Sequence, residues 1–209
     1  LLPSGVRKPL FGFLGGVYPK ADWAPKVLRA KTTFQAMARD TVEGYFHGVS
    51  VMGDELRDKV YSAAFKRRLN GYRAVEVLRR HHAHSPVRDG DAVSQVQYLD
   101  MKTYMVGDIL TKVDRASMAH ALEVRVPFLD HKLMEWVSGL PVDFKLKGAE
   151  GKYMLKKALE PHLPHDIMYR RKMGFSIPLA EWFRGPLKDK LYAALTTQRM
   201  ADTSLFDMA

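Results

Sequence analysis

YLDMKTYMVGDILTKVDRASMAHALEVRVPFLD, residues 98–130, is the stretch from which the fold is inferred. Its apolar residues recur at intervals of three and four, which is the spacing of one helix face. They are Tyr98, Met101, Met105, Ile109 and Val113. Asp108 precedes Lys112 by one helical turn, in the order that stabilises a helix. Gly107 weakens a continuous helix, so a break is expected there, with a short helix over 108–113.

The second half of this stretch changes character. Asp114 is a candidate cap for a fresh helical turn that starts at Arg115. Beyond Leu122, charged and apolar residues alternate, and Pro127 excludes a helix interior while it favours an extended shape for Val126. A helix that leads into a rigid, charged, extended segment either aims side chains at a site or forms a helical hairpin with a buried ion pair.

Three ordered motifs resemble those of the glutamine-dependent asparagine synthetase family. They are the segment from Tyr98 to Trp136, GKYMLKKAL at 151–159 and LPHDIMYRRKMGF at 163–175. The resemblance implies that the whole chain, 1–209, is the C-terminal helical portion of the family's synthetase domain. Within it we expect a loosely matching entry region at 1–90, a motif-bearing core at 91–185 and a flexible tail at 196–209.

The predicted fold class is mainly α, because every periodic segment has the helical spacing. No run of β-branched residues between glycine turns marks a parallel strand. The family resemblance implies an α/β domain of the pyrophosphatase type, with its parallel sheet largely outside this chain. The 209 residues lack both the family's Ser-Gly-Gly-x-Asp-Ser pyrophosphate loop and the cysteine with which the family hydrolyses glutamine. The chain alone is therefore expected to be inactive.

The composition, 46% hydrophobic and 27% charged, is ordinary for a globular protein. No apolar run approaches the roughly 20 residues of a membrane helix, and the first residues lack the pattern of a secretion signal. The absence of cysteine is typical of a cytoplasmic protein. The net charge of +10 includes basic clusters at residues 66–80 and 170–172, but stacking aromatics do not alternate with them. Neither nucleic acid nor a membrane is therefore a predicted partner.

The chemistry that the resemblance implies is ATP-dependent amide formation with Mg²⁺. The aspartate carboxylate attacks the α-phosphate of ATP, and ammonia from a glutaminase domain of the same protein then displaces AMP to give asparagine. Both steps build negative charge that fixed cations stabilise. The resemblance assigns this role to Lys152 of the Gly-Lys-Tyr motif, and the helix start predicted there adds the positive end of a helix dipole.

The other candidate residues lie in the quoted stretch. Glu123 and Arg125 match the family's Glu-x-Arg-x-Pro-Phe-Leu-Asp motif. In related β-lactam-forming synthetases a similar glutamate assists a catalytic tyrosine, which implies a catalytic role for Glu123. The two residues either serve the site in this way or form a buried structural pair. Asp114 and Arg115, with Lys112, are expected to support the wall of the site next to pyrophosphate.

Several other patterns predict structure rather than chemistry. Gly53-Asp54-Glu55 resembles a nucleotide-binding element of the family, but no Phe-Gly-Gly-Tyr run follows it, so it predicts a helix start with a basic helix beyond. His81, His82 and His84 lack the spacing of a helical zinc site, and no metal site is predicted. Residues 1–23, rich in glycine, proline and aromatics, are expected to be irregular. Helices are expected from Pro25 and over 131–140.

Two alternative functions remain open. The parent protein could amidate another acceptor, as asparagine-synthetase-like amidotransferases of polysaccharide and sorting gene clusters do. The chain could also be a non-catalytic helical interaction module. A homodimer is a further partner that the resemblance allows. Lys172 and Gly174 lie in a matching motif, but the sequence assigns them no role.

Overall fold

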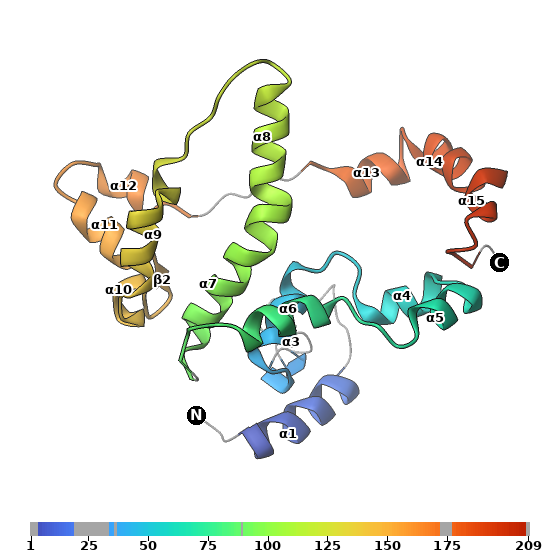
Figure 1. The fold of residues 1–209 in the computed structure, drawn as a ribbon, viewed down its shortest axis with the longest axis horizontal. Coiled ribbons are helices and arrows are strands. Elements are labelled where there is room, and N and C mark those ends of the chain that lie inside the picture. Colours follow the sequence, from blue (N-terminus) through green and yellow to red (C-terminus); the bar gives the residue numbers. More distant parts are fainter. Residues whose placement is uncertain (1–3, 19–33, 36, 89, 172–176, 208–209) are drawn as a thin grey trace. The chain divides into compact units, whose positions relative to one another are not determined.

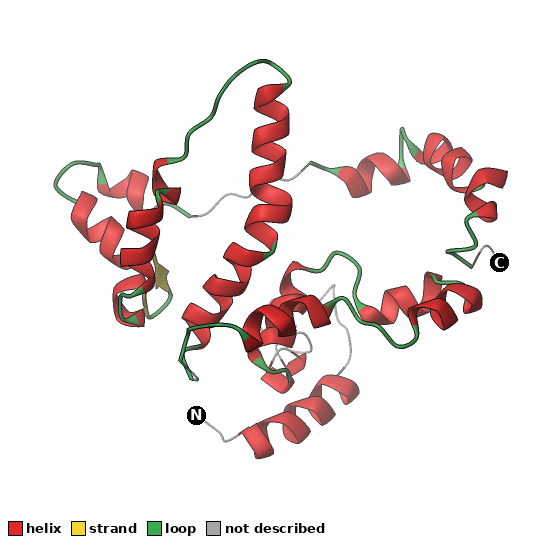
Figure 2. Ribbon diagram, viewed as in Figure 1, coloured by secondary structure: helices red, strands yellow, loops and turns green. Residues whose placement is uncertain are grey.

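The computed structural model describes most of the chain as helices (Figure 1). The described residues are 4–18, 34–35, 37–88, 90–171 and 177–207. Figure 2 shows that strand is confined to one short hairpin within them. The mainly α fold class is therefore confirmed. The chain divides into two units, Leu1–Val51 with Arg73–Val142 and Met52–Tyr72 with Asp143–Ala209.

A small apolar core joins three helices of the first unit. These helices are α3 (Thr41–Val49), α6 (Val75–Ala83) and α7 (Ala92–Lys102). The buried hydrophobic side chains are Val42, Val75, Leu78 and Leu99, against which Tyr45, Phe46 and Tyr98 pack. Asp40 caps α3 by accepting a hydrogen bond from the Glu43 N–H, and Asp91 caps α7 through the Ser94 N–H.

Polar contacts link the same helices beside the core. The Tyr45 hydroxyl of α3 donates to Asp100 Oδ1 of α7 over 2.8 Å. Burial, followed by this hydrogen bond to a carboxylate, raises the pKa of Tyr45. Arg79 Nη2 of α6 lies 2.7 Å from Glu43 Oε1 of α3. Part of the basic cluster seen in the sequence is thus neutralised within the unit.

The central helical stretch is built differently from the prediction. α7 ends at Lys102, and its C-cap Thr103, with a φ of −129° and a ψ of −80°, leaves the helical region. A π-helix, η2 (Met105–Leu110), follows and leads directly into α8 (Thr111–Met118). The expected break at Gly107 is wrong, because a glycine weakens a helix without forbidding it. The Gly107 N–H donates to the Thr103 carbonyl over 2.8 Å.

α8 ends in a Schellman motif, in which two backbone bonds satisfy the last carbonyls. The Leu122 N–H donates to the Ser117 carbonyl over 3.0 Å, and the Ala121 N–H to the Met118 carbonyl over 3.0 Å. Ala121 takes the left-handed position of the motif at a φ of 55°. Asp114 lies inside α8, so the prediction that it caps a new helical turn is wrong.

The chain then runs through an extended connection into the last helix of the first unit. A short 3₁₀-helix, η3 (Pro127–Leu129), precedes α9 (His131–Ser138). Asp130 caps α9 by accepting a hydrogen bond from the Leu133 N–H over 3.1 Å. Gly139 follows at the C-cap, which confirms the predicted helix.

The expectation of an irregular start is wrong over most of the first 23 residues. α1 (Ser4–Val17) is a helix that contains Pro9. The signal for it was present in the sequence, because Val6, Leu10, Phe13 and Val17 follow the helical period. Gly15 allows a close approach, since a Cβ there would lie 2.9 Å from Gln35 Cγ. The helix predicted to begin at Pro25 lies outside the described residues as far as Thr33.

The second unit is a set of short helices with one hairpin. Its elements include α4 (Asp54–Val60), α5 (Ala63–Leu69), α10 (Val142–Lys145), β1 (Leu146–Lys147), β2 (Glu150–Gly151), α11 (Tyr153–Leu159), α12 (His165–Met168), α13 (Leu179–Arg184), α14 (Lys188–Leu195) and α15 (Gln198–Asp202). Gly53 lies at the N-cap of α4, so the predicted helix start is confirmed. The single basic helix expected after it is two helices, because Ser62 caps a new start through the Phe65 N–H.

Residues near the end of the chain pair with the junction between α4 and α5. Tyr61 and Phe206 form an antiparallel bridge. The Asp207 N–H donates to the Val60 carbonyl over 2.8 Å. The flexible tail predicted for 196–209 and the domain boundaries predicted from the sequence stay predictions.

Among the described residues, no helix combines the length and the apolar character needed to cross a membrane.

Candidate functional site

A hairpin and a helix of the second unit hold Lys152 between them. β1 and β2 pair antiparallel, with Leu146 opposite Gly151 and Lys147 opposite Glu150. A two-residue loop connects them, and its first residue, Gly148, has a φ of 60°, which glycine adopts without steric cost. The chain then passes through Lys152 directly into α11. The predicted position of Lys152 at a helix start is confirmed.

Lys152 has an unusual backbone conformation for its residue type. Its φ of 58° and ψ of 33° are left-handed, a region that costs a residue with a Cβ roughly 1–2 kcal/mol. Such outliers persist only where the surroundings determine them. The side chain is exposed, and no hydrogen-bonding or ionic partner for its ammonium group lies among the described residues. α11 is only seven residues long, so the positive charge offered at this helix start comes mainly from the Lys152 ammonium group and not from a helix dipole.

An ion pair ties together the two elements on either side of Lys152. The Glu150 carboxylate of β2 contacts the Lys156 ammonium group of α11. The Lys156 side chain is only 20% exposed, and its ammonium group lies 4.8 Å from the centroid of the Tyr169 ring. Pairing in a partly buried position is stronger than on an open surface. This ion pair, the Glu150–Lys156 clasp, therefore fixes the backbone from which Lys152 projects.

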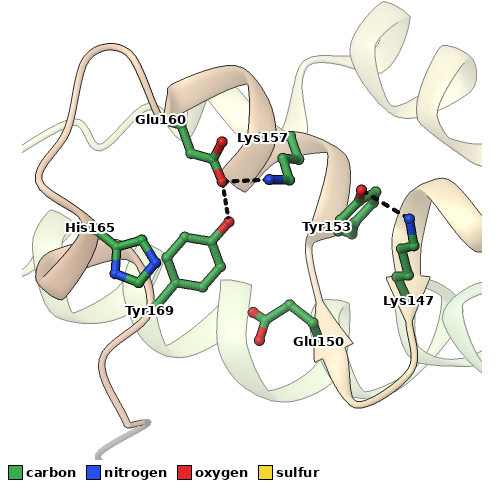
Figure 3. A pocket seen from close by; sticks show the side chains of 7 residues that line it. All are labelled: Lys147, Glu150, Tyr153, Lys157, Glu160, His165 and Tyr169. Atoms are coloured by element: carbon green, nitrogen blue, oxygen red, sulfur yellow. Dashed lines mark hydrogen bonds and ion pairs between the residues drawn. The ribbon is translucent and has the colours of Figure 1, made fainter.

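A pocket of about 370 Å³ lies beside this clasp (Figure 3). Its lining residues are Lys147, Glu150, Tyr153, Lys157, Glu160, His165 and Tyr169. The Lys147 ammonium group donates to the Tyr153 hydroxyl over 3.2 Å, and the His165 ring stacks on Tyr169 at a centroid distance of 4.4 Å. The pocket thus joins side chains from two of the three sequence motifs.

Glu160 is the acceptor for two donors at this pocket. Figure 3 shows the Lys157 ammonium group and the Tyr169 hydroxyl converging on one of its carboxylate oxygens, at 2.9 and 2.7 Å. The bond from Lys157, and then that from Tyr169, lower the pKa of Glu160. The same contact with Glu160 raises the pKa of Lys157 and that of Tyr169. The acid therefore stays ionised while both donors keep their protons.

This arrangement predicts a pH dependence. Because the pKa of Glu160 is lowered by folding, its contribution to stability is present above its ordinary pKa of 4.5 and is lost as the pH falls through the lowered value. An NMR titration of the Glu160 carboxyl should give a midpoint below 4.5. Lys157→Met should raise that midpoint, whereas Lys147→Met, which removes a lysine bonded to Tyr153 instead, should not. Equal titrations in the two variants would contradict the assignment.

The remaining predicted residues lie in the first unit. Lys112 Nζ lies 2.6 Å from Asp108 Oδ1, which confirms the predicted helical pair and raises the pKa of Lys112. Asp114 and Arg115 project from α8 with exposed side chains, and Arg115 Nε is 4.0 Å from Asp114 Oδ2. Asp108, Lys112, Asp114 and Arg115 thus lie on one helical stretch. Within the described residues, the ion pairs among them are Asp108–Lys112 and Asp114–Arg115.

Glu123 and Arg125 form an ion pair with each other. Arg125 Nη2 lies 2.5 Å from Glu123 Oε1, but the side chains are 85% and 68% exposed, respectively. The pair is therefore not buried, in contrast to the structural alternative drawn from the sequence. Two exposed charges are available to a ligand, and they gain little from each other.

Sequence reasoning missed the cluster formed by Glu160, His165 and Tyr169. A signal existed, since His165 and Tyr169 are four residues apart in a motif that was recognised, the spacing of neighbours on a helix face. Lys172 and Gly174 of the same motif lie outside the described residues.

The sequence model of the asparagine synthase family matches residues 18–209. The chain is 39% identical over 97 residues to asparagine synthetase 1 (glutamine-hydrolyzing) of Bacillus subtilis, which covers 46% of this chain and 15% of that protein. It is 40% identical over 127 residues to asparagine synthetase 3 of the same organism, with coverages of 58% and 20%.

A different kind of relative matches a longer part of the chain. The chain is 25% identical over 209 residues to the amidase chry2 of Gibberella zeae, which covers 96% of this chain and 29% of that protein. The chain thus spans less than a third of the length of each of these relatives. No solved structure matches. Because the family model covers nearly the whole sequence, the chain belongs to the asparagine synthase family.

Proposed function

We propose that the chain is part of an ATP-dependent ligase that converts a carboxylate into an amide. The observation that carries this proposal is the placement of Lys152. An exposed ammonium group projects from a left-handed backbone position that the hairpin, α11 and the Glu150–Lys156 clasp hold in place. A preorganised charge stabilises a transition state because it pays no reorganisation energy as negative charge develops.

The proposed reaction has two steps. The side-chain carboxylate of aspartate attacks the α-phosphorus of ATP, and the bond to pyrophosphate breaks to leave an aspartyl adenylate. Ammonia released from glutamine then attacks the acyl carbon, and AMP leaves as asparagine forms. Lys152 neutralises charge on the phosphoryl oxygens in the first step and on the tetrahedral oxyanion in the second. Both roles use the same fixed cation.

The other candidate residues have supporting places in this proposal. Glu123 is assigned a catalytic role next to the acyl group, with Arg125 as its ionic partner. Asp114 and Arg115, with Lys112, support the wall next to pyrophosphate. Mg²⁺ enters with the phosphates of ATP, whose oxygen atoms are the kind of ligand that it prefers.

The proposal also includes partners and a location. A glutaminase domain of the same polypeptide supplies ammonia, which accords with the names of the glutamine-hydrolyzing synthetases of Bacillus subtilis. The cytoplasm provides the ATP, aspartate and glutamine that the reaction consumes. A homodimer is compatible with this scheme and is part of the proposal only as an assembly of complete polypeptides.

One observation favours a second candidate acceptor. The match to the amidase chry2 covers 96% of this chain, whereas the Bacillus synthetases match 46% and 58% of it. The two classes of relative differ in name and in the share of this chain that they match. An amidotransferase that acts on another carboxylate would use the same adenylation step and the same fixed cation.

The test is an assay of the complete polypeptide that contains residues 1–209. With ATP, Mg²⁺, aspartate and glutamine, it should form asparagine, AMP and pyrophosphate in equal amounts, because one adenylation precedes each amide. Residues 1–209 by themselves should release no pyrophosphate above background, since they contain neither a Ser-Gly-Gly-x-Asp-Ser loop nor a cysteine.

The substrate requirement separates the two candidates. Pyrophosphate release that needs a different carboxylate in place of aspartate would replace the asparagine reaction by the second candidate function. If the complete polypeptide released no pyrophosphate from ATP with any carboxylate tried, the ligase proposal would be wrong.

A further inference from the structure

The connection between α8 and η3 is an extended segment without backbone partners. It begins at Leu122, where the Schellman motif ends α8, and runs to Val126, whose φ of −110° and ψ of 100° are those of a strand. Among the described residues, neither the N–H groups of residues 123–126 nor the carbonyls of 122–125 take part in a hydrogen bond. Figure 2 shows the segment as a loop between the two helices. It therefore offers an open row of donors and acceptors.

The side chains of this segment alternate between two faces. The contact of 2.5 Å between Glu123 and Arg125 places both charged side chains on one face. Because a strand has a period of two, the opposite face carries Leu122, Val124 and Val126. These side chains are 60%, 46% and 41% exposed. One face of the segment is thus apolar and exposed, and the other carries the Glu123–Arg125 ion pair, in which the two charges cancel.

The unpaired backbone groups and the exposed apolar face together indicate what kind of partner the segment can bind. A helix could cover the apolar face, but its own backbone groups are already paired and cannot bond to the segment. A β-strand pairs with the segment through its backbone and packs its alternate side chains beside the apolar ones on the same face. The ion pair leaves the segment without net charge, so docking does not leave an unpaired charge next to an apolar partner.

We propose that residues 122–126 dock as an edge strand on a β-sheet supplied by the remainder of the same polypeptide. The lengths of the relatives support a partner in the same chain: 97 and 127 matched residues are only 15% and 20% of the two Bacillus synthetases. Docking leaves Glu123 and Arg125 on the face opposite to the apolar side chains, on a backbone that is hydrogen-bonded along one edge. The docked strand thereby sets the direction in which this charged pair points.

The test is amide hydrogen exchange with residue resolution on the complete polypeptide that contains residues 1–209. An edge strand bonds through one of its two sides, so alternate amides should be protected. Either Glu123 and Arg125 or Val124 and Val126 should exchange at least ~100-fold more slowly than an exposed amide, and the other two should not. Uniform exchange at the exposed rate, or equal protection of all four amides, would overturn the proposal.

A variant tests whether the apolar face carries the docking. Val124→Asp should reduce the protection at least ~10-fold, because it places a charge on that face. Val124→Thr keeps a β-branched side chain and should give a smaller loss, which covers the case in which Val124→Asp does not fold. The control is Val51→Asp, at a fully exposed valine of the same unit, which should leave the protection unchanged.

Two outcomes of these measurements would count against the proposal. Wild-type protection in both Val124 variants would show that the apolar face is not the docking surface. Protection that disappears when the polypeptide is diluted to monomers would assign the face to a second copy of the chain and would overturn docking within one polypeptide.

Discussion

Replacement of Lys152 by alanine in the complete polypeptide should lower synthetase turnover by at least ~100-fold, the scale for the loss of one preorganised charge stabiliser. Folding should survive, because the side chain is exposed and has no polar partner in the described part of the chain. Alanine and lysine both carry a Cβ, so the left-handed backbone strains them equally. Glutaminase activity, which we assign to a separate domain, should be retained. Rates of pyrophosphate release and of glutamine hydrolysis measure the two effects separately.

Three further variants sharpen this expectation. Lys152→Arg should rescue turnover poorly, because a planar guanidinium does not replace a compact ammonium group. Lys152→Gly removes the Cβ that the left-handed conformation disfavours, so it should fold at least as readily as alanine and still lack activity. Lys188→Ala is the matched control, since Lys188 is an exposed lysine at the first position of α14, outside the recognised motifs. It should leave turnover unchanged.

A near-normal rate for Lys152→Ala would make Lys152 an ordinary surface residue. The charge stabiliser would then be sought at Arg125, whose guanidinium is 85% exposed and bonded to Glu123. The same assay on Arg125→Ala would decide between the two positions.

Leu99→Ala should destabilise the first unit by about 2–5 kcal/mol, the range for a leucine that leaves a cavity in a packed core. Leu99 is 0% exposed and belongs to the buried cluster that joins α3, α6 and α7. Because a multidomain protein does not unfold in two states, the measurement is native-state hydrogen exchange of amides in these helices at increasing urea concentrations.

The control for this variant is Leu10→Ala in α1 of the same unit. Leu10 is 44% exposed, so its truncation should cost less than ~1 kcal/mol by the same measurement. A loss below ~1 kcal/mol for Leu99→Ala would mean that the helices are held together by contacts other than this core.

The helices that the sequence predicted well are those with strong local signals. α9 ends with Gly139 at its C-cap, as expected, and the structure adds a capping aspartate, Asp130, at its start. α1 was missed because glycine and proline were given more weight than the apolar period of Val6, Leu10 and Phe13. The π-helix could not be predicted, since periodicity and propensity describe α-helices and strands and give no signal for a wider turn.

The site was predictable in part for the same reason. The motif located Lys152 at a helix start, but the left-handed backbone and the Glu150–Lys156 clasp depend on the hairpin geometry. A Glu123–Arg125 pair was one of two alternatives drawn from the sequence, whereas its exposure depends on what packs nearby. Local sequence patterns do not carry that information.

The π-helix η2 has a consequence for how residues of this chain can be matched to those of its relatives. A π-helix accommodates roughly one residue more per turn than an α-helix. A relative with one residue fewer inside 105–110 could therefore form an ordinary α-helix there and still present Lys112, Asp114 and Arg115 in the same direction. The same deletion within 111–118 would rotate every later side chain of the helix by about 100°. A one-residue gap in an alignment is thus harmless to the motif in η2 and disruptive in α8.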